Sequence, residues 1–96
     1  MGIKDLLEAK REEILKIASR NGVHKLWVFG SVARGEADDE SDIDLLIEVG
    51  GPTPPWFPGG LVAELEELLG HRVDIVEAGS LRQQLRERVL AEAIPL

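Results

Sequence analysis

The feature that most restricts the fold of this chain is the segment Gly50–Gly60, GGPTPPWFPGG, which holds four prolines and four glycines in eleven residues. Proline lacks a backbone N–H and glycine weakens regular structure, so we expect an irregular connector that no helix or central strand enters. We expect Trp56 and Phe57, inside it, to fold back over a thin core. The alternative is that these rings stack on a nucleobase or anchor a partner protein.

Apolar periodicity predicts the regular elements on either side. Residues 3–20 place apolar side chains at helical spacing, and Asn21-Gly22 is a helix stop. The segment DIDLLIEV, residues 42–49, alternates at period two and predicts a strand whose apolar face is Ile43, Leu45, Ile47 and Val49. The other expected elements are a strand over 25–29, a turn or single helical turn over 31–35, a helix over 61–69, a strand over 72–77, and a last helix with an apolar stripe that starts at Ser80 in a capping box with Gln83.

This order of elements predicts an α/β (α+β) fold, a small mixed sheet flanked by helices. The connection from Val49 to Arg72 contains a helix and is long enough for a crossover. It would place the second and third strands parallel, or at least side by side. We expect residues 1–96 to form a single domain with one core. An uncovered edge of such a sheet could support a homo-oligomer.

The net charge of −7 is concentrated in one short segment. Seven acids and no base lie between Glu36 and Glu48, and subtracting them from the 18 acids leaves 11 against 11 bases elsewhere. Such acidity suits a cation site and argues against nucleic-acid binding, although a solvated acidic loop is the alternative. No apolar run reaches the ~18 residues of a membrane span. Cysteine is absent, which excludes disulfides and zinc–thiolate sites and makes the cytoplasm the expected location.

Three aspartates form the candidate metal site. Alternation along a strand places Asp42 and Asp44 on one face, about 6.5–7 Å apart along the backbone. Two carboxylates this close repel each other unless a cation lies between them, and Mg²⁺ binds through carboxylates and phosphate oxygens. If the third strand lies beside the second, Asp74 joins this surface and could hold a second metal or accept the proton of an attacking hydroxyl. The alternatives are a solvated strand start for the pair and an edge-strand carboxylate or an ion pair with Arg72 for Asp74.

The candidate anion site lies just before this acidic segment. Glycine at the end of a strand, here Gly30, lets the backbone approach a phosphate closely. The N–H groups that follow and the Ser31 hydroxyl could then bind phosphate oxygens, and Arg34 could add positive charge. Ser31 could instead cap a helix, and Arg34 could pair with the acidic loop. An anion site beside a dicarboxylate site favours a metal-bound phosphate that bridges the two.

The segment GSVARGEADDESDIDLLIEV, residues 30–49, resembles the signature of the minimal nucleotidyltransferases in the polymerase-beta-like superfamily. The resemblance extends to ELEELLGHRVDIVEAGSL and the closing RERVLAEAIPL. It implies that Gly30 and Ser31 match the family's Gly-Ser pair. It also implies that Asp42 and Asp44 match its metal aspartates and Asp74 its third carboxylate.

The same resemblance implies a function. Members of this kind are often encoded beside a HEPN-domain ribonuclease toxin and act as antitoxins, in some cases by transferring AMP to a tyrosine of that toxin. We therefore expect an enzyme that uses Mg²⁺, in a two-metal site, to transfer NMP from ATP or another nucleoside triphosphate to a hydroxyl of a partner protein. Two alternatives stay open, a non-catalytic nucleotide-binding module that neutralises a toxin by contact, and a simple acidic metal-binding domain.

Overall fold

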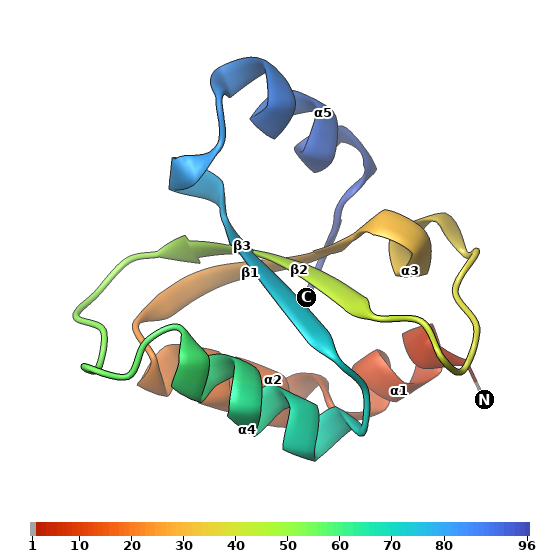
Figure 1. Cartoon of the computed structure of the whole chain (residues 1–96), viewed down its shortest axis with the longest axis horizontal. Helices are drawn as coiled ribbons and strands as arrows, with labels where there is room; N and C mark the ends of the chain where they lie inside the picture. Colours follow the sequence, from red (N-terminus) through yellow and green to blue (C-terminus); the bar gives the residue numbers. More distant parts are fainter. Residues whose placement is uncertain (1) are drawn as a thin grey trace.

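A computed structural model of the chain describes residues 2–96, which form one four-stranded mixed sheet with helices on both faces (Figure 1). The strands are β1 (Val23–Phe29), β2 (Ile43–Val49), β3 (Val73–Glu77) and β4 (Ile94–Pro95). The helices are α1 (Ile3–Ala9), α2 (Arg11–Arg20), α3 (Gly30–Arg34), α4 (Gly59–Leu69) and α5 (Gln83–Glu92), with a 3₁₀ turn at Ala78–Ser80. The expected fold class is confirmed.

The strands lie in the order β3-β2-β1-β4. β1 pairs antiparallel with β2 and with β4, whereas β2 and β3 pair in parallel. The expected crossover is therefore confirmed, because α4 carries the chain from the end of β2 back to the start of β3. None of the helices formed by residues 2–96 is long and apolar enough to cross a membrane.

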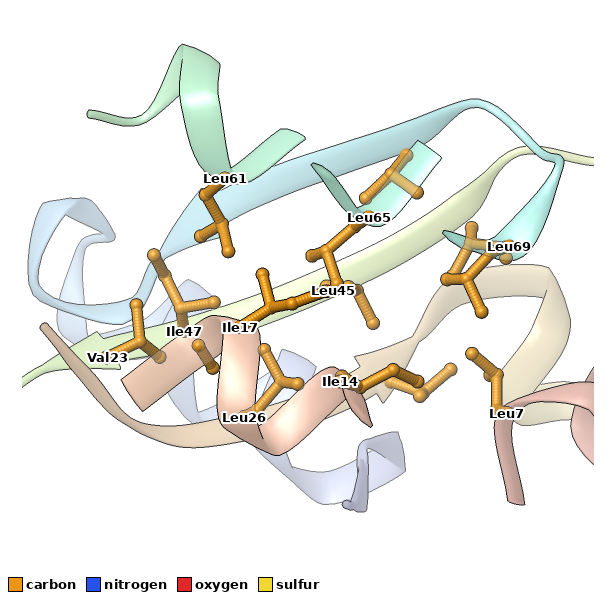
Figure 2. Packing of buried hydrophobic residues seen from close by; sticks show 14 of the residues in the cluster. Leu7, Ile14, Ile17, Val23, Leu26, Leu45, Ile47, Leu61, Leu65 and Leu69 are labelled. Carbon is orange, nitrogen blue, oxygen red and sulfur yellow. The ribbon is translucent and has the colours of Figure 1, made fainter. Parts of the chain in front are cut away.

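The main core lies between the sheet and the layer formed by α1, α2 and α4 (Figure 2). Alternation along β2 turns Ile43, Leu45 and Ile47 into this layer, and each is completely buried. α2 contributes Ile14 and α4 contributes Leu65, which are equally inaccessible to solvent. This packing fixes which face of β2 points away from the core, and therefore where its polar side chains go.

The predicted single helix over residues 3–20 is wrong, because it breaks at Lys10 into α1 and α2. Lys10 has φ −102° and ψ 8°, outside the helical region. The buried stripe explains the break. Leu7 and Ile14 are buried. The positions between them at helical spacing are 10 and 11, and these are occupied by Lys10 and Arg11, which do not enter the core.

The connector differs from its prediction at its end, where α4 already begins at Gly59. Phe57 packs against the core as expected. Trp56 does not, because 66% of its surface is exposed. It lies over Gly60 instead, where a Cβ would collide with the Trp56 ring.

The C-terminal part departs furthest from the sequence prediction. The last helix begins at Gln83, and the Ser80 hydroxyl donates a 2.7 Å hydrogen bond to the Glu77 carbonyl, so the predicted capping box is absent. α5 lies across the sheet from α1, α2 and α4 (Figure 1) and buries none of its residues. The predicted apolar stripe is therefore largely solvent-exposed, with Leu85 47% exposed. The chain then returns as β4, which the sequence did not predict.

Candidate active site

The three predicted aspartates meet where β1 ends and where β2 and β3 begin. In the register of the sheet Asp44 is the partner of Phe29 on one side and of Asp74 on the other. Neighbouring strands lie about 4.8 Å apart, so the backbones at positions 44 and 74 are in direct contact. Asp42 lies just before β2 and is exposed.

The same register decides which way these side chains face. Ile43 and Leu45, on either side of Asp44, are buried in the main core, and Val73 beside Asp74 is buried there too. Asp44 and Asp74 therefore occupy the opposite face of the sheet, where Asp44 is half-buried and Asp74 exposed. The expectation that alternation would bring them to one surface agrees with this geometry.

The pKa of the Asp44 carboxyl reflects both its burial and the charges of its neighbours. Burial raises the pKa of its carboxyl, and the neighbouring charges of Asp74 and Asp42 raise it further. Arg34 acts in the opposite direction and lowers it. Like-charged carboxylates on one surface with incomplete compensation form a site that a cation would stabilise. Because all the donors are carboxylate oxygens, this set fits a hard divalent ion such as Mg²⁺.

In the arrangement described for residues 2–96, no three acidic or histidine side chains lie close enough together to enclose a metal ion. The strand register already holds Asp44 next to Asp74, so rotation about the side-chain bonds of these aspartates can bring their oxygens to a shared ion. The backbone thus holds Asp44 and Asp74 side by side, without the three acids being gathered into a closed group of metal ligands.

The structure gives Gly30 a requirement for glycine that the sequence did not reveal. Its φ of +71° lies in the left-handed region, and a Cβ on this residue would collide with Oδ2 of Asp44. The absence of a side chain thus leaves room for the Asp44 carboxylate. Ser31 is half-buried and is the second residue of α3, whose N-cap is Phe29, so the alternative that Ser31 caps a helix is wrong.

Arg34 contacts two carboxylates. Its Nε donates to Oε1 of Glu36 at 3.0 Å, and its Nη1 donates to Oε1 of Glu92 at 3.3 Å. The hydrogen bond to Glu36 is the main reason that the pKa of Arg34 is raised, with Glu92 adding to it. The alternative given for Arg34, an ion pair with the acidic segment, is thus present in this structure through Glu36.

Glu92 is the residue at this site that sequence reasoning missed. The backbone N–H of Gly30 donates to its Oε1 at 3.2 Å, the same oxygen that Arg34 contacts. Glu92 is 62 residues from Gly30 in sequence. It arrives there because β4 pairs Ile94 with Val28, near the end of β1. A two-residue strand that contains proline gives no sequence signal, so this neighbour could not have been foreseen.

The chain is similar to known proteins in sequence and in fold. Residues 11–96 match the nucleotidyltransferase domain family. The chain is 37% identical to the protein adenylyltransferase MntA of Thermococcus cleftensis, over 96% of this chain and 90% of that protein. A solved structure provisionally described as a minimal nucleotidyltransferase superposes with a TM-score of 0.85 at 47% identity, covering 100% of this chain and 97% of the other.

A more distant structure shares the fold. It contains a tri-AMPylated Shewanella oneidensis HEPN toxin in complex with an MNT antitoxin. It matches at 20% identity with a TM-score of 0.67, over 92% of this chain and 69% of that one. The family match and the relative in Thermococcus cleftensis decide the classification, and this chain belongs to the nucleotidyltransferase domain family.

Proposed function

We propose that this chain is a Mg²⁺-dependent nucleotidyltransferase that transfers AMP from ATP to a hydroxyl of a partner protein. The observation that carries the proposal is the pairing of Asp44 with Asp74 in the sheet, beside the left-handed Gly30. It places a carboxylate surface beside a glycine whose backbone N–H is a candidate donor to a phosphate. The name of the Thermococcus cleftensis relative, a protein adenylyltransferase, supports AMP as the transferred group and a protein as the acceptor.

Each residue has a role in this proposal. Asp42, Asp44 and Asp74 hold the metal, in a site for two ions. When bound, Mg²⁺ neutralises phosphate charge and orients the α-phosphate for in-line attack. Gly30 and Ser31 bind the β- and γ-phosphates through the backbone N–H and the hydroxyl, and Arg34 offsets their charge. These assignments rest on the carboxylate register and on the position of Gly30.

Asp74 is also proposed to move a proton. Asp74 is exposed, whereas its partner Asp44 is half-buried, so an acceptor hydroxyl can reach the Asp74 carboxylate. The hydroxyl oxygen bonds to the α-phosphorus, the bond from that phosphorus to the bridging oxygen breaks, and pyrophosphate leaves. The hydroxyl proton goes to the Asp74 carboxylate.

The proposed partner is a HEPN-domain toxin. The Shewanella oneidensis complex pairs an antitoxin of the same fold with a toxin of this class that carries AMP groups. We also propose that residues 1–96 act as one catalytic domain, and that it works in the cytoplasm, where its nucleotide substrate is found.

The test compares the wild type with Asp42→Asn and Asp44→Asn, using α-labelled ATP, Mg²⁺ and a HEPN-domain toxin. We expect label on a toxin hydroxyl with the wild type and a loss of at least about a hundredfold with either variant, because each removes a proposed metal ligand. Asp39→Asn is the matched control, since it removes one exposed charge from the same acidic segment. It should leave transfer intact.

Unchanged transfer by folded Asp42→Asn or Asp44→Asn would end the catalytic proposal. Toxin neutralisation that survives the double variant would instead favour the contact-only antitoxin. An acidic metal-binding domain would bind Mg²⁺ in calorimetry without binding ATP.

A further inference from the structure

The carboxylate of Glu92 lies where the proposed function places a nucleotide phosphate. Its Oε1 accepts from the Gly30 N–H at 3.2 Å and from Nη1 of Arg34 at 3.3 Å. These two donors belong to two of the three residues assigned to the triphosphate. A carboxylate oxygen and a phosphate oxygen are both anionic acceptors for N–H donors. With Glu92 in this position, the single N–H of Gly30 and one N–H of the Arg34 Nη1 group are already engaged.

We propose that Glu92 is an internal competitor for nucleotide, a carboxylate that occupies the phosphate position and must leave before the triphosphate binds. This inference rests on the proposed function. Glu92 is thereby a residue that sets nucleotide affinity rather than a catalytic residue. Its negative charge would also repel an incoming triphosphate at this position.

The arrangement of Arg34 supports competition. Its Nε is engaged with Glu36, at 3.0 Å to one oxygen and 3.3 Å to the other, while Nη1 is engaged with Glu92. Departure of Glu92 frees Nη1 without disturbing the contact with Glu36. The guanidinium would then stay oriented by Glu36 and present a free donor to the phosphate.

The contact is weak enough to be exchanged. The side chains of Arg34 and Glu92 are 48% and 39% exposed, and exposed ion pairs contribute little because water screens them. β4 anchors the end of α5 to β1, so we expect the exchange to occur by rotation of the partly exposed Glu92 side chain and not by a shift of the helix. We therefore expect a competition that changes nucleotide affinity severalfold and does not block the site.

The competing explanation is that Glu92 positions Gly30 and Arg34 for the nucleotide. The two explanations predict opposite effects on affinity. Removing a competitor strengthens nucleotide binding, whereas removing a positioning residue weakens it.

The experiment measures the dissociation constant of a non-hydrolysable ATP analogue with Mg²⁺ for the wild type, Glu92→Ala, Glu92→Gln and Glu87→Gln. Glu87→Gln is the matched control, because it removes a charge from the exposed side of α5, where Glu87 accepts a hydrogen bond from Gln83. We expect Glu92→Ala to bind the analogue roughly three- to tenfold more tightly, from loss of an exposed pair and a like charge. Glu92→Gln should fall between it and the wild type, and Glu87→Gln should stay within about twofold.

Inorganic tripolyphosphate is the second ligand, because it has the phosphates without the base. The same ranking with this ligand supports competition at the phosphate position. In ¹⁵N spectra without ligand, Glu92→Ala should also shift the Gly30 amide resonance, since that amide loses its acceptor.

Binding by Glu92→Ala that is equal to or weaker than binding by a wild type that transfers AMP would overturn this inference and leave the proposed function standing. Failure of the wild type and every variant to bind the analogue at millimolar concentration would instead sink both.

Discussion

Gly30→Ala separates the functional requirement for this glycine from its structural one. Two consequences follow from the geometry. The residue has φ +71°, which an alanine adopts only with strain, and the added Cβ would collide with Oδ2 of Asp44. The collision is with the end of a side chain, so the carboxylate can rotate away. Its Cγ, 3.2 Å from that Cβ, must shift as well.

The two effects have different magnitudes. The left-handed conformation costs an L-residue about 1–2 kcal/mol. For a domain of this size that lowers the midpoint of thermal unfolding by about 4–16 °C. We expect displacement of the carboxylate proposed to bind the metal to be more damaging to function, because losing even an outer-shell partner of a metal ligand typically lowers metal affinity or activity about 10–100-fold. We therefore expect a folded, moderately destabilised variant with very low AMP transfer.

Gly70→Ala is the matched control. Gly70 has the same φ, +71°, at the end of α4, but a Cβ there meets nothing within 4 Å. Both variants should lose similar stability in thermal unfolding followed by circular dichroism. Only Gly30→Ala should lose AMP transfer, assayed at a temperature where both proteins are folded.

Two results would refute this reasoning. Wild-type transfer by Gly30→Ala would show that the Asp44 carboxylate is not needed in its observed place. Equal loss of transfer in Gly70→Ala would show that the defect comes from lost stability and not from the collision.

Two further predictions concern stability. Leu65→Ala should lower the free energy of unfolding in urea by about 2–5 kcal/mol, because it leaves a cavity under α4. Leu85→Ala, at a position 47% exposed, should change it little. Without divalent cations, Asp44→Asn should raise the midpoint of thermal unfolding at pH 7, whereas Asp39→Asn should not. The raised pKa of Asp44 means that the folded chain holds this proton more tightly than the unfolded chain, so stability falls as pH rises from the unfolded pKa, near 3.8, through the folded one. The higher unfolding midpoint of Asp44→Asn should therefore vanish at pH values below the unfolded pKa. An equally raised midpoint at low pH would contradict this prediction.

The parts of the site that follow local rules could be predicted from sequence. The alternation of DIDLLIEV fixes Asp44 opposite the apolar face, and the α4 crossover makes β3 parallel to β2, which brings Asp74 alongside. Both rules depend only on strand periodicity and connection length.

The parts of the site that depend on contacts between residues distant in sequence could not be predicted. Glu92 reaches Gly30 only because two residues, Ile94 and Pro95, pair with β1. Nothing in the pattern of such a short segment signals a strand. The break at Lys10 coincides with a charged turn in the apolar stripe, Lys10 and Arg11. Both residue types have high helix propensity, so the sequence favoured one continuous helix over two. The Ser80 capping box failed because the Ser80 hydroxyl bonds back to Glu77, a competing local contact that the same residue types also favour.

The charges around Arg34 connect the proposed metal site to the proposed phosphate site. In this structure Arg34 partly offsets the charge of Asp44 while it pairs with Glu36 and Glu92. A cation held by Asp44 and Asp74 would offset the charge of Asp44 in place of Arg34, because a divalent ion offsets those carboxylates more completely than a guanidinium beside them. The positive charge of the ion would make the surroundings of Arg34 less negative, which favours exchanging the single charge of Glu92 for the larger charge of a triphosphate. Metal binding and nucleotide binding should accordingly strengthen each other, and by linkage the gain must be the same in either order of addition.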